Sequence, residues 1–199
     1  HVARHPANSA TFARRIAAAV DDVLSVVSNH RQGDLPMQHV VRRLDLPTHP
    51  VTDAEYAEAK TTIESLNAKK DAITSREWRL RKGKQYIVDR YDAQKRSEGK
   101  HAVELHAIRL GDLAIATNPF ELYVDYGVQI VARSRATQTM LIQLAGQLND
   151  HGYYVPTEDA IAGGSYSTEI SSTPVGPEGG QILVERSVEA INALFPGAK

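Results

Sequence analysis

Apolar residues in the first hundred positions recur mainly at helical spacing. In residues 9–29 they fall on one side of a predicted amphipathic helix, at Phe12, Ile16, Val20, Val23, Leu24 and Val27. Thr52–Ala68 begins with a threonine and has a glutamate three residues later, the pattern of a capping box. This pattern predicts a second helix there. A third helix is expected from Ser75 to Gln94, and residues 38–45 favour a strand.

The pattern changes after residue 100. Residues 101–109 alternate between apolar and polar side chains, as a half-buried strand does, and Gly111-Asp112 is typical of a tight turn. Two buried strands are expected at Leu113–Thr117 and Met140–Leu144, and two helices at Pro119–Ala132 and Gln181–Leu194. Residues 149–180 form one long polar segment. Long polar segments of this kind are often functional.

This order of elements predicts a mixed α/β (α+β) fold in which helices flank a sheet. Residues 1–100 form a mainly helical segment, and residues 101–199 form a strand-rich segment that contains the candidate site loops. The first segment has no obvious partner of its own, so we expect it to complete a larger domain. The chain begins with His1 and not with Met, so we also expect that upstream residues have been removed.

The composition is that of an ordinary globular protein, with 42% hydrophobic and 24% charged residues and a net charge of -1. The absence of cysteine excludes disulfides, thiolate metal sites and a cysteine nucleophile. No apolar run approaches the ~20 residues of a membrane span. Basic residues do cluster at Arg76, Arg79, Arg81, Lys82 and Lys84. We interpret them as a solvated helix face, and we expect no nucleic-acid partner.

Three segments carry the side chains that chemistry needs. Glu121 follows a buried strand, which is a common place for a ligand or catalytic group in α/β proteins, although a carboxylate early in a helix is also favoured by the helix dipole. Residues 149–157 combine an amide, an acid, an imidazole and two phenols, which can line a pocket or simply form a polar turn with aromatic packing. Residues 163–169 start with two glycines, which let the backbone approach a ligand closely, but flexible surface loops have the same composition and are commoner.

The histidine spacing gives little support for a zinc site built from this chain alone. His1 and His5 have the spacing of a helical ligand pair, but Pro6 follows them directly. His101 and His106 are expected on opposite faces of their strand. The sequence also contains no glycine-rich phosphate loop and no Gly-x-Ser-x-Gly elbow.

Several short motifs, taken in order, resemble the neutral/alkaline non-lysosomal ceramidase family. The similar stretch runs from about Ala107 to Ala190, and residues 46–56 also look like the family's segment before a helical hairpin. The motifs of the main stretch are Ile108-Arg109-Leu110-Gly111-Asp112-Leu113-Ala114-Ile115, Asn118-Pro119-Phe120-Glu121 with Gly127, Leu144-Ala145-Gly146, Asn149, Tyr154-Val155-Pro156-Thr157 and Tyr166. By this resemblance, residues 1–199 are the C-terminal portion of a ceramidase-like catalytic domain.

The resemblance implies a zinc-dependent amidohydrolase that cleaves an N-acyl amide, ceramide or a related lipid. In the family, two histidines, a glutamate and a tyrosine hold the zinc ion, and the last two match Glu121 and Tyr154. Tyr154 and Tyr166 take the catalytic positions, and Asn149 and Tyr166 face the substrate. The histidines belong to the N-terminal half of the same domain, which becomes the expected partner. We therefore expect an empty or weakly filled zinc site in this chain alone, and a secreted or periplasmic location.

Two departures from the family leave the substrate open. Val128-Gln129-Ile130 replaces a part of the helix that is rich in arginine in ceramide-cleaving members, and Ser167-Thr168 replaces a Glu-Gly pair after the second tyrosine. The alternative hypothesis is a non-catalytic ceramidase-like fragment, or a scaffold that binds a lipid or a glycan without a complete metal site.

Overall fold

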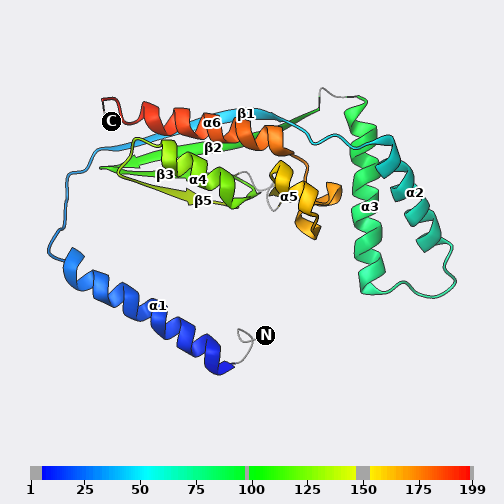
Figure 1. The fold of residues 1–199 in the computed structure, drawn as a ribbon, viewed down its shortest axis with the longest axis horizontal. Helices are drawn as coiled ribbons and strands as arrows, with labels where there is room; N and C mark the ends of the chain where they lie inside the picture. Colours follow the sequence, from blue (N-terminus) through cyan, green and yellow to red (C-terminus); the bar gives the residue numbers. More distant parts are fainter. Residues whose placement is uncertain (1–5, 97–98, 147–152, 198–199) are drawn as a thin grey trace. The chain divides into compact units, whose positions relative to one another are not determined.

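The computed structural model describes residues 6–96, 99–146 and 153–197, and its contacts divide the chain into two units, His1–Pro36 and Met37–Lys199. The first unit contains one helix, α1 (Pro6–Val27), at the place where residues 9–29 predict it (Figure 1). Its apolar side chains remain exposed: Phe12, Ile16, Val20, Val23, Leu24, Val26 and Val27. Within the described part of the chain, no helix is long and apolar enough to cross a membrane.

A four-stranded sheet with the order β1-β2-β3-β5 forms the centre of the second unit (Figure 1). Its strands are β1 (Met37–Pro47), β2 (Lys100–Leu110), β3 (Leu113–Thr117) and β5 (Gln138–Ile142). The first three pair antiparallel, and β3 pairs parallel with β5. The predicted turn between β2 and β3 is present, and Gly111 has the positive φ of 60° that favours glycine there. Because β1 pairs with β2, the two segments on either side of residue 100 share this sheet.

Two helices cover one face of the sheet. Helix α6 (Pro177–Ala193) packs against β1, β2 and β3, and α4 (Val124–Arg133) packs against β5 and α6. The core between these layers contains buried side chains from every one of these elements except β5, among them Leu46, Leu105, Ala107, Ala114, Ile130, Leu183 and Ile191. The predicted mixed α/β fold, with helices flanking a sheet, is confirmed.

The opposite face of the sheet keeps several apolar side chains exposed: Met37, Val41, Leu110, Met140 and Ile142. His39 and His106 also lie on this face, as their register shows: His39 is opposite Ile108, and His106 is opposite both Val41 and Thr117. This face is therefore a mixed surface of apolar side chains and imidazoles.

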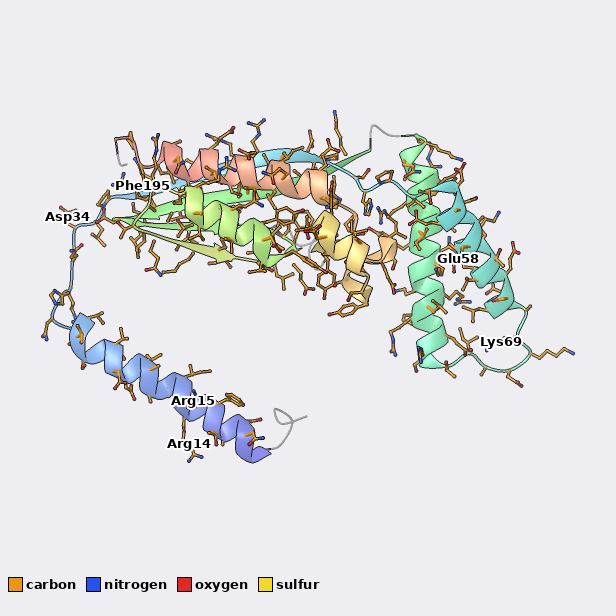
Figure 2. All side chains as sticks on the ribbon, in the orientation of Figure 1. Arg14, Arg15, Asp34, Glu58, Lys69 and Phe195 are labelled. Carbon is orange, nitrogen blue, oxygen red and sulfur yellow. The ribbon has the colours of Figure 1, made fainter. Side chains whose placement is uncertain are left out.

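Helices α2 (Asp53–Asn67) and α3 (Ser75–Gln94) form a hairpin with its own small core. Both begin with the capping box that their sequences contain, formed by Thr52 with Glu55 in α2. An ion pair joins the two helices of the hairpin: Lys84 of α3 pairs with Glu58 of α2. Glu58 is labelled in Figure 2. Part of the basic cluster on α3 is thus used inside the hairpin.

The region around Glu121 differs from its prediction. The expected helix from Pro119 begins only at Val124, and a two-residue strand, β4 (Glu121–Leu122), precedes it. The long polar segment holds a second short strand, β6 (Tyr154–Val155), a short helix, α5 (Glu158–Gly163), and two 3₁₀ turns. Glu121 is therefore a strand residue, and the helix-start interpretation of this carboxylate is wrong.

Candidate functional site

Glu121 and Tyr154 lie directly opposite each other in a two-stranded parallel pair formed by β4 and β6. The backbone N–H of Glu121 donates to the carbonyl of Tyr153 at 2.9 Å. The next residue of each strand, Leu122 and Val155, is buried in the core. Since side chains alternate along a strand, burial of these two residues directs Glu121 and Tyr154 together to the opposite side, where both are half-buried.

Two amide side chains shape the backbone that leads into this pair. Asn118 is 4% exposed, and its Oδ1 accepts from the N–H of Phe120 at 3.0 Å. Gln143, just after β5, accepts from the N–H of Leu122 through Oε1 and donates to its carbonyl through Nε2, both at 3.0 Å. The side chain of Gln143 thus satisfies the free edge of β4, which allows so short a strand to persist.

Tyr166 joins the pair from the 3₁₀ turn Tyr166–Thr168. Its hydroxyl lies 3.4 Å from the hydroxyl of Tyr154, and the two rings meet edge to face with centroids 5.7 Å apart. The hydrogen bond with Tyr166 raises the pKa of the Tyr154 phenol well above its usual value, and the neighbouring Glu121 carboxylate raises this pKa further. The phenol of Tyr154 is therefore held in its protonated form at neutral pH.

The loop that carries Tyr166 is fixed at both ends. Thr157 caps α5 by accepting from the N–H of Ala160 at 3.2 Å, and Gly164 ends this helix with a positive φ of 69°. The hydroxyls of Tyr123 and Ser167 lie 2.7 Å apart, which ties the turn to the residue just before α4. The loop of residues 163–169 is therefore anchored to the β4–β6 pair.

The structure brings together three of the four predicted site residues: Glu121, Tyr154 and Tyr166. Asn149 lies outside the described residues. In the described ranges no group of three or more His, Asp or Glu side chains is arranged to hold a metal ion. A carboxylate and a phenol suit a zinc ion as oxygen donors, so the pair would fit as part of a zinc ligand set.

Three features of this site are not predicted by the sequence. Gln143 and Asn118 support the backbone, and each is an amide residue directly after a strand of the sheet. Leu144 has a φ of 55°, a conformation that a non-glycine residue rarely adopts. Its N–H donates to the carbonyl of Phe120, next to Glu121. Such conformations cluster at functional sites, but sequence alone gives no sign of this one.

The chain was compared with known families, curated proteins and solved structures. No protein-family model matches its sequence, and no curated protein does. The structure is similar to the crystal structure of a neutral ceramidase from Pseudomonas aeruginosa, with a TM-score of 0.45 and 16% sequence identity. The match covers 81% of this chain and 28% of that chain. The chain thus spans less than a third of the length of that protein.

Proposed function

We propose that this chain supplies part of the active site of a zinc-dependent amidohydrolase, with Glu121 and Tyr154 as two metal ligands and Tyr166 beside them. The observation that carries the proposal is the register of β4 and β6, which sets a carboxylate directly opposite a phenol. The ceramidase-like order of motifs around these residues supports the same assignment, because it puts a ligand at each of these two positions.

A zinc ion bound here would polarise an amide carbonyl and acidify a water molecule. The residues of this chain have separate tasks. Glu121 contributes negative charge, and Tyr154 contributes a phenol whose proton must leave when the oxygen becomes a ligand, so metal binding at this position is coupled to proton release. Tyr166, which is 69% exposed and lies beside the Tyr154 hydroxyl, would donate a hydrogen bond to a substrate.

The substrate proposed from the resemblance is an N-acyl amide with a lipid chain. The other zinc ligands, two histidines, would come from the N-terminal half of the same domain, which is the proposed partner. For this chain alone we propose little or no zinc binding at the Glu121–Tyr154 pair, because it has only two ligands and the raised pKa of the Tyr154 phenol opposes the loss of proton that ligation requires. A secreted or periplasmic location is proposed on the same resemblance.

A lipid-binding scaffold without catalysis is the second candidate, and one observation favours it. An open apolar groove of about 520 Å³ runs along α4 and is lined by Val124, Val128 and Val131 with Leu141 of β5. The first two of these valines are 74% and 62% exposed. A groove of this kind can bind an alkyl chain without any metal ion.

Hydrolysis assays on the complete gene product that contains this chain separate the two candidates. The enzyme proposal expects release of fatty acid from an N-acyl sphingoid amide. The rate of release should fall at least a hundredfold in Glu121→Gln. It should be retained in the matched control Glu158→Gln, which changes an exposed carboxylate on α5. The scaffold alternative expects no hydrolysis and binding of a fluorescent fatty-acid analogue that Val128→Asp abolishes. Hydrolysis that Glu121→Gln leaves intact would overturn the site assignment.

A further inference from the structure

Two histidines from neighbouring strands meet on the exposed face of the four-stranded sheet. Nε2 of His39 in β1 lies 3.0 Å from Nδ1 of His106 in β2. The ring centroids are 5.2 Å apart, and the ring planes differ by 17°. Since the nitrogens are much closer than the centroids, the two rings meet at their nitrogen-bearing edges and not face to face. The two nitrogens therefore share a hydrogen bond, in which one imidazole donates its N–H to the lone pair of the other.

A carboxylate lies behind one of the two rings. Oε2 of Glu104 is 3.9 Å from Nε2 of His106, and Oε1 of Glu104 accepts from Nε of Arg43 at 3.3 Å. At 3.9 Å this carboxylate is too far for a hydrogen bond with the ring, but its negative charge favours a cation beside the histidine pair.

The pair borders an open cavity of about 370 Å³, which is also lined by Thr117, Ala145 and Gly146. Thr117 lies opposite His106 in the register of β2 and β3. Its Oγ1 is buried and makes no hydrogen bond with any of the residues that the structure describes. A buried hydroxyl without a partner is costly unless water or a ligand meets it, so the cavity has room for a ligand and a polar atom to meet it.

We propose that a divalent transition-metal ion such as Zn²⁺ replaces the proton of this hydrogen bond and is bound by His39 and His106, with water in the remaining positions. The imidazole that donated the hydrogen bond then carries its proton on its other ring nitrogen. Zinc–nitrogen bonds of 2.0–2.1 Å place two nitrogens of a tetrahedral site roughly 3.3–3.4 Å apart. The observed separation of 3.0 Å is within a few tenths of an ångström of that value. Imidazole suits Zn²⁺, Ni²⁺ and Cu²⁺. This site is separate from the Glu121–Tyr154 pair and does not depend on the proposed hydrolase function.

Titration of the 199-residue chain with Zn²⁺, followed by calorimetry, tests the proposal. The parent for every comparison carries His1→Ala and His5→Ala, so that the two imidazoles nearest the N-terminus do not contribute. Saturable binding is expected. His39→Ala and His106→Ala should each weaken it at least tenfold, whereas His30→Ala, an exposed histidine of the first unit, should leave it unchanged. Far-UV circular dichroism checks that each variant is folded.

A gain of affinity provides the second arm. Thr117→His places a third imidazole opposite His106 on the same face of the sheet, and it should tighten Zn²⁺ binding at least tenfold. In the parent chain, Co²⁺ should broaden the amide resonances of β1 and β2 around the two histidines. The proposal is overturned if His39→Ala binds Zn²⁺ as tightly as the parent, if Thr117→His leaves the affinity unchanged, or if Co²⁺ broadens resonances around other residues instead.

Discussion

Glu121 faces Tyr154 across two parallel strands of only two residues each. Neither side chain needs to extend far to reach the other, because the backbone register sets their positions. The buried neighbours Leu122 and Val155 lock that register, since a shift by one residue would expose both of them and bury the carboxylate. The pair is thus fixed by the core beneath it.

Removing either the Tyr166 hydroxyl or the Glu121 carboxylate should lower the raised pKa of the Tyr154 phenol. We expect a large decrease in Tyr166→Phe, which removes the hydrogen bond, and a smaller one in Glu121→Gln, which removes the carboxylate charge. NMR titration of the ¹³Cζ resonances of the tyrosines measures this pKa. Since the folded state holds a proton that the unfolded chain loses above pH ~10, the stabilisation by Tyr154 is present below pH 10 and declines above it. An unchanged pKa in both variants would contradict the described contacts.

Two glycines in helices should respond to alanine in opposite ways. A Cβ at Gly180 in α6 would lie 2.5 Å from the ring of Tyr126, whose hydroxyl is held by the carbonyl of Pro156 at 2.9 Å. Gly180→Ala should therefore lower the free energy of unfolding by about 1–3 kcal/mol. A Cβ at Gly83 in α3 meets only Ser171 at 3.8 Å, so Gly83→Ala should raise the free energy of unfolding by about 0.5–1 kcal/mol. Urea unfolding measures both, and equal effects would argue against the packing of α6 on α4.

Arg90 should be important for stability despite its position on a helix rich in charged residues. Its guanidinium donates to the carbonyls of His49, Ile170 and Thr173, and so joins α3 to two separate segments. Arg90→Met leaves these carbonyls without their donor, and we expect a loss of about 2–3 kcal/mol in the free energy of unfolding. Arg76→Met, at an exposed position of the same helix, should change it by less than about 0.5 kcal/mol. Similar losses in the two variants would contradict this role of Arg90.

His49 should make the fold sensitive to acid. Burial lowers its pKa in the folded state, and the charge of Arg90 lowers it further. Below pH ~6.5 the unfolded chain binds a proton that the folded state still resists, so stability should fall as the pH decreases from there. His49→Gln should reduce this pH dependence between pH 7 and pH 5, measured by urea unfolding. An identical slope in wild type and variant would show that another group is responsible.

Local sequence signals predicted most elements because their causes are local. The capping box of Thr52 and Glu55 and the alternating residues of β2 are where the sequence places them. Glu121 shows the limit of this reasoning. The segment after Pro119 has the composition of a helix start, but its backbone pairs with Tyr153 and Val155, far along the chain, and these long-range hydrogen bonds decide the local structure.

Sequence spacing could not reveal the contact between His39 and His106 either. Spacing within one segment reveals only histidines of the same helix or strand, whereas these two meet because β1 pairs with β2 in a particular register. The same holds for Gln143, which supports β4 from beyond the end of β5. Contacts that depend on strand register are not visible until the register is known.

Zinc content of the complete gene product tests the central claim most directly. In a parent that carries His39→Ala and His106→Ala, and so lacks the second proposed site, the account predicts close to one equivalent of zinc. Adding either Glu121→Gln or Tyr154→Phe should then reduce the affinity at least tenfold, since each loses one of the proposed ligands. Glu158→Gln and Tyr123→Phe serve as matched controls and should keep their zinc. Zinc content and affinity equal to those of the parent in both Glu121→Gln and Tyr154→Phe would contradict the account.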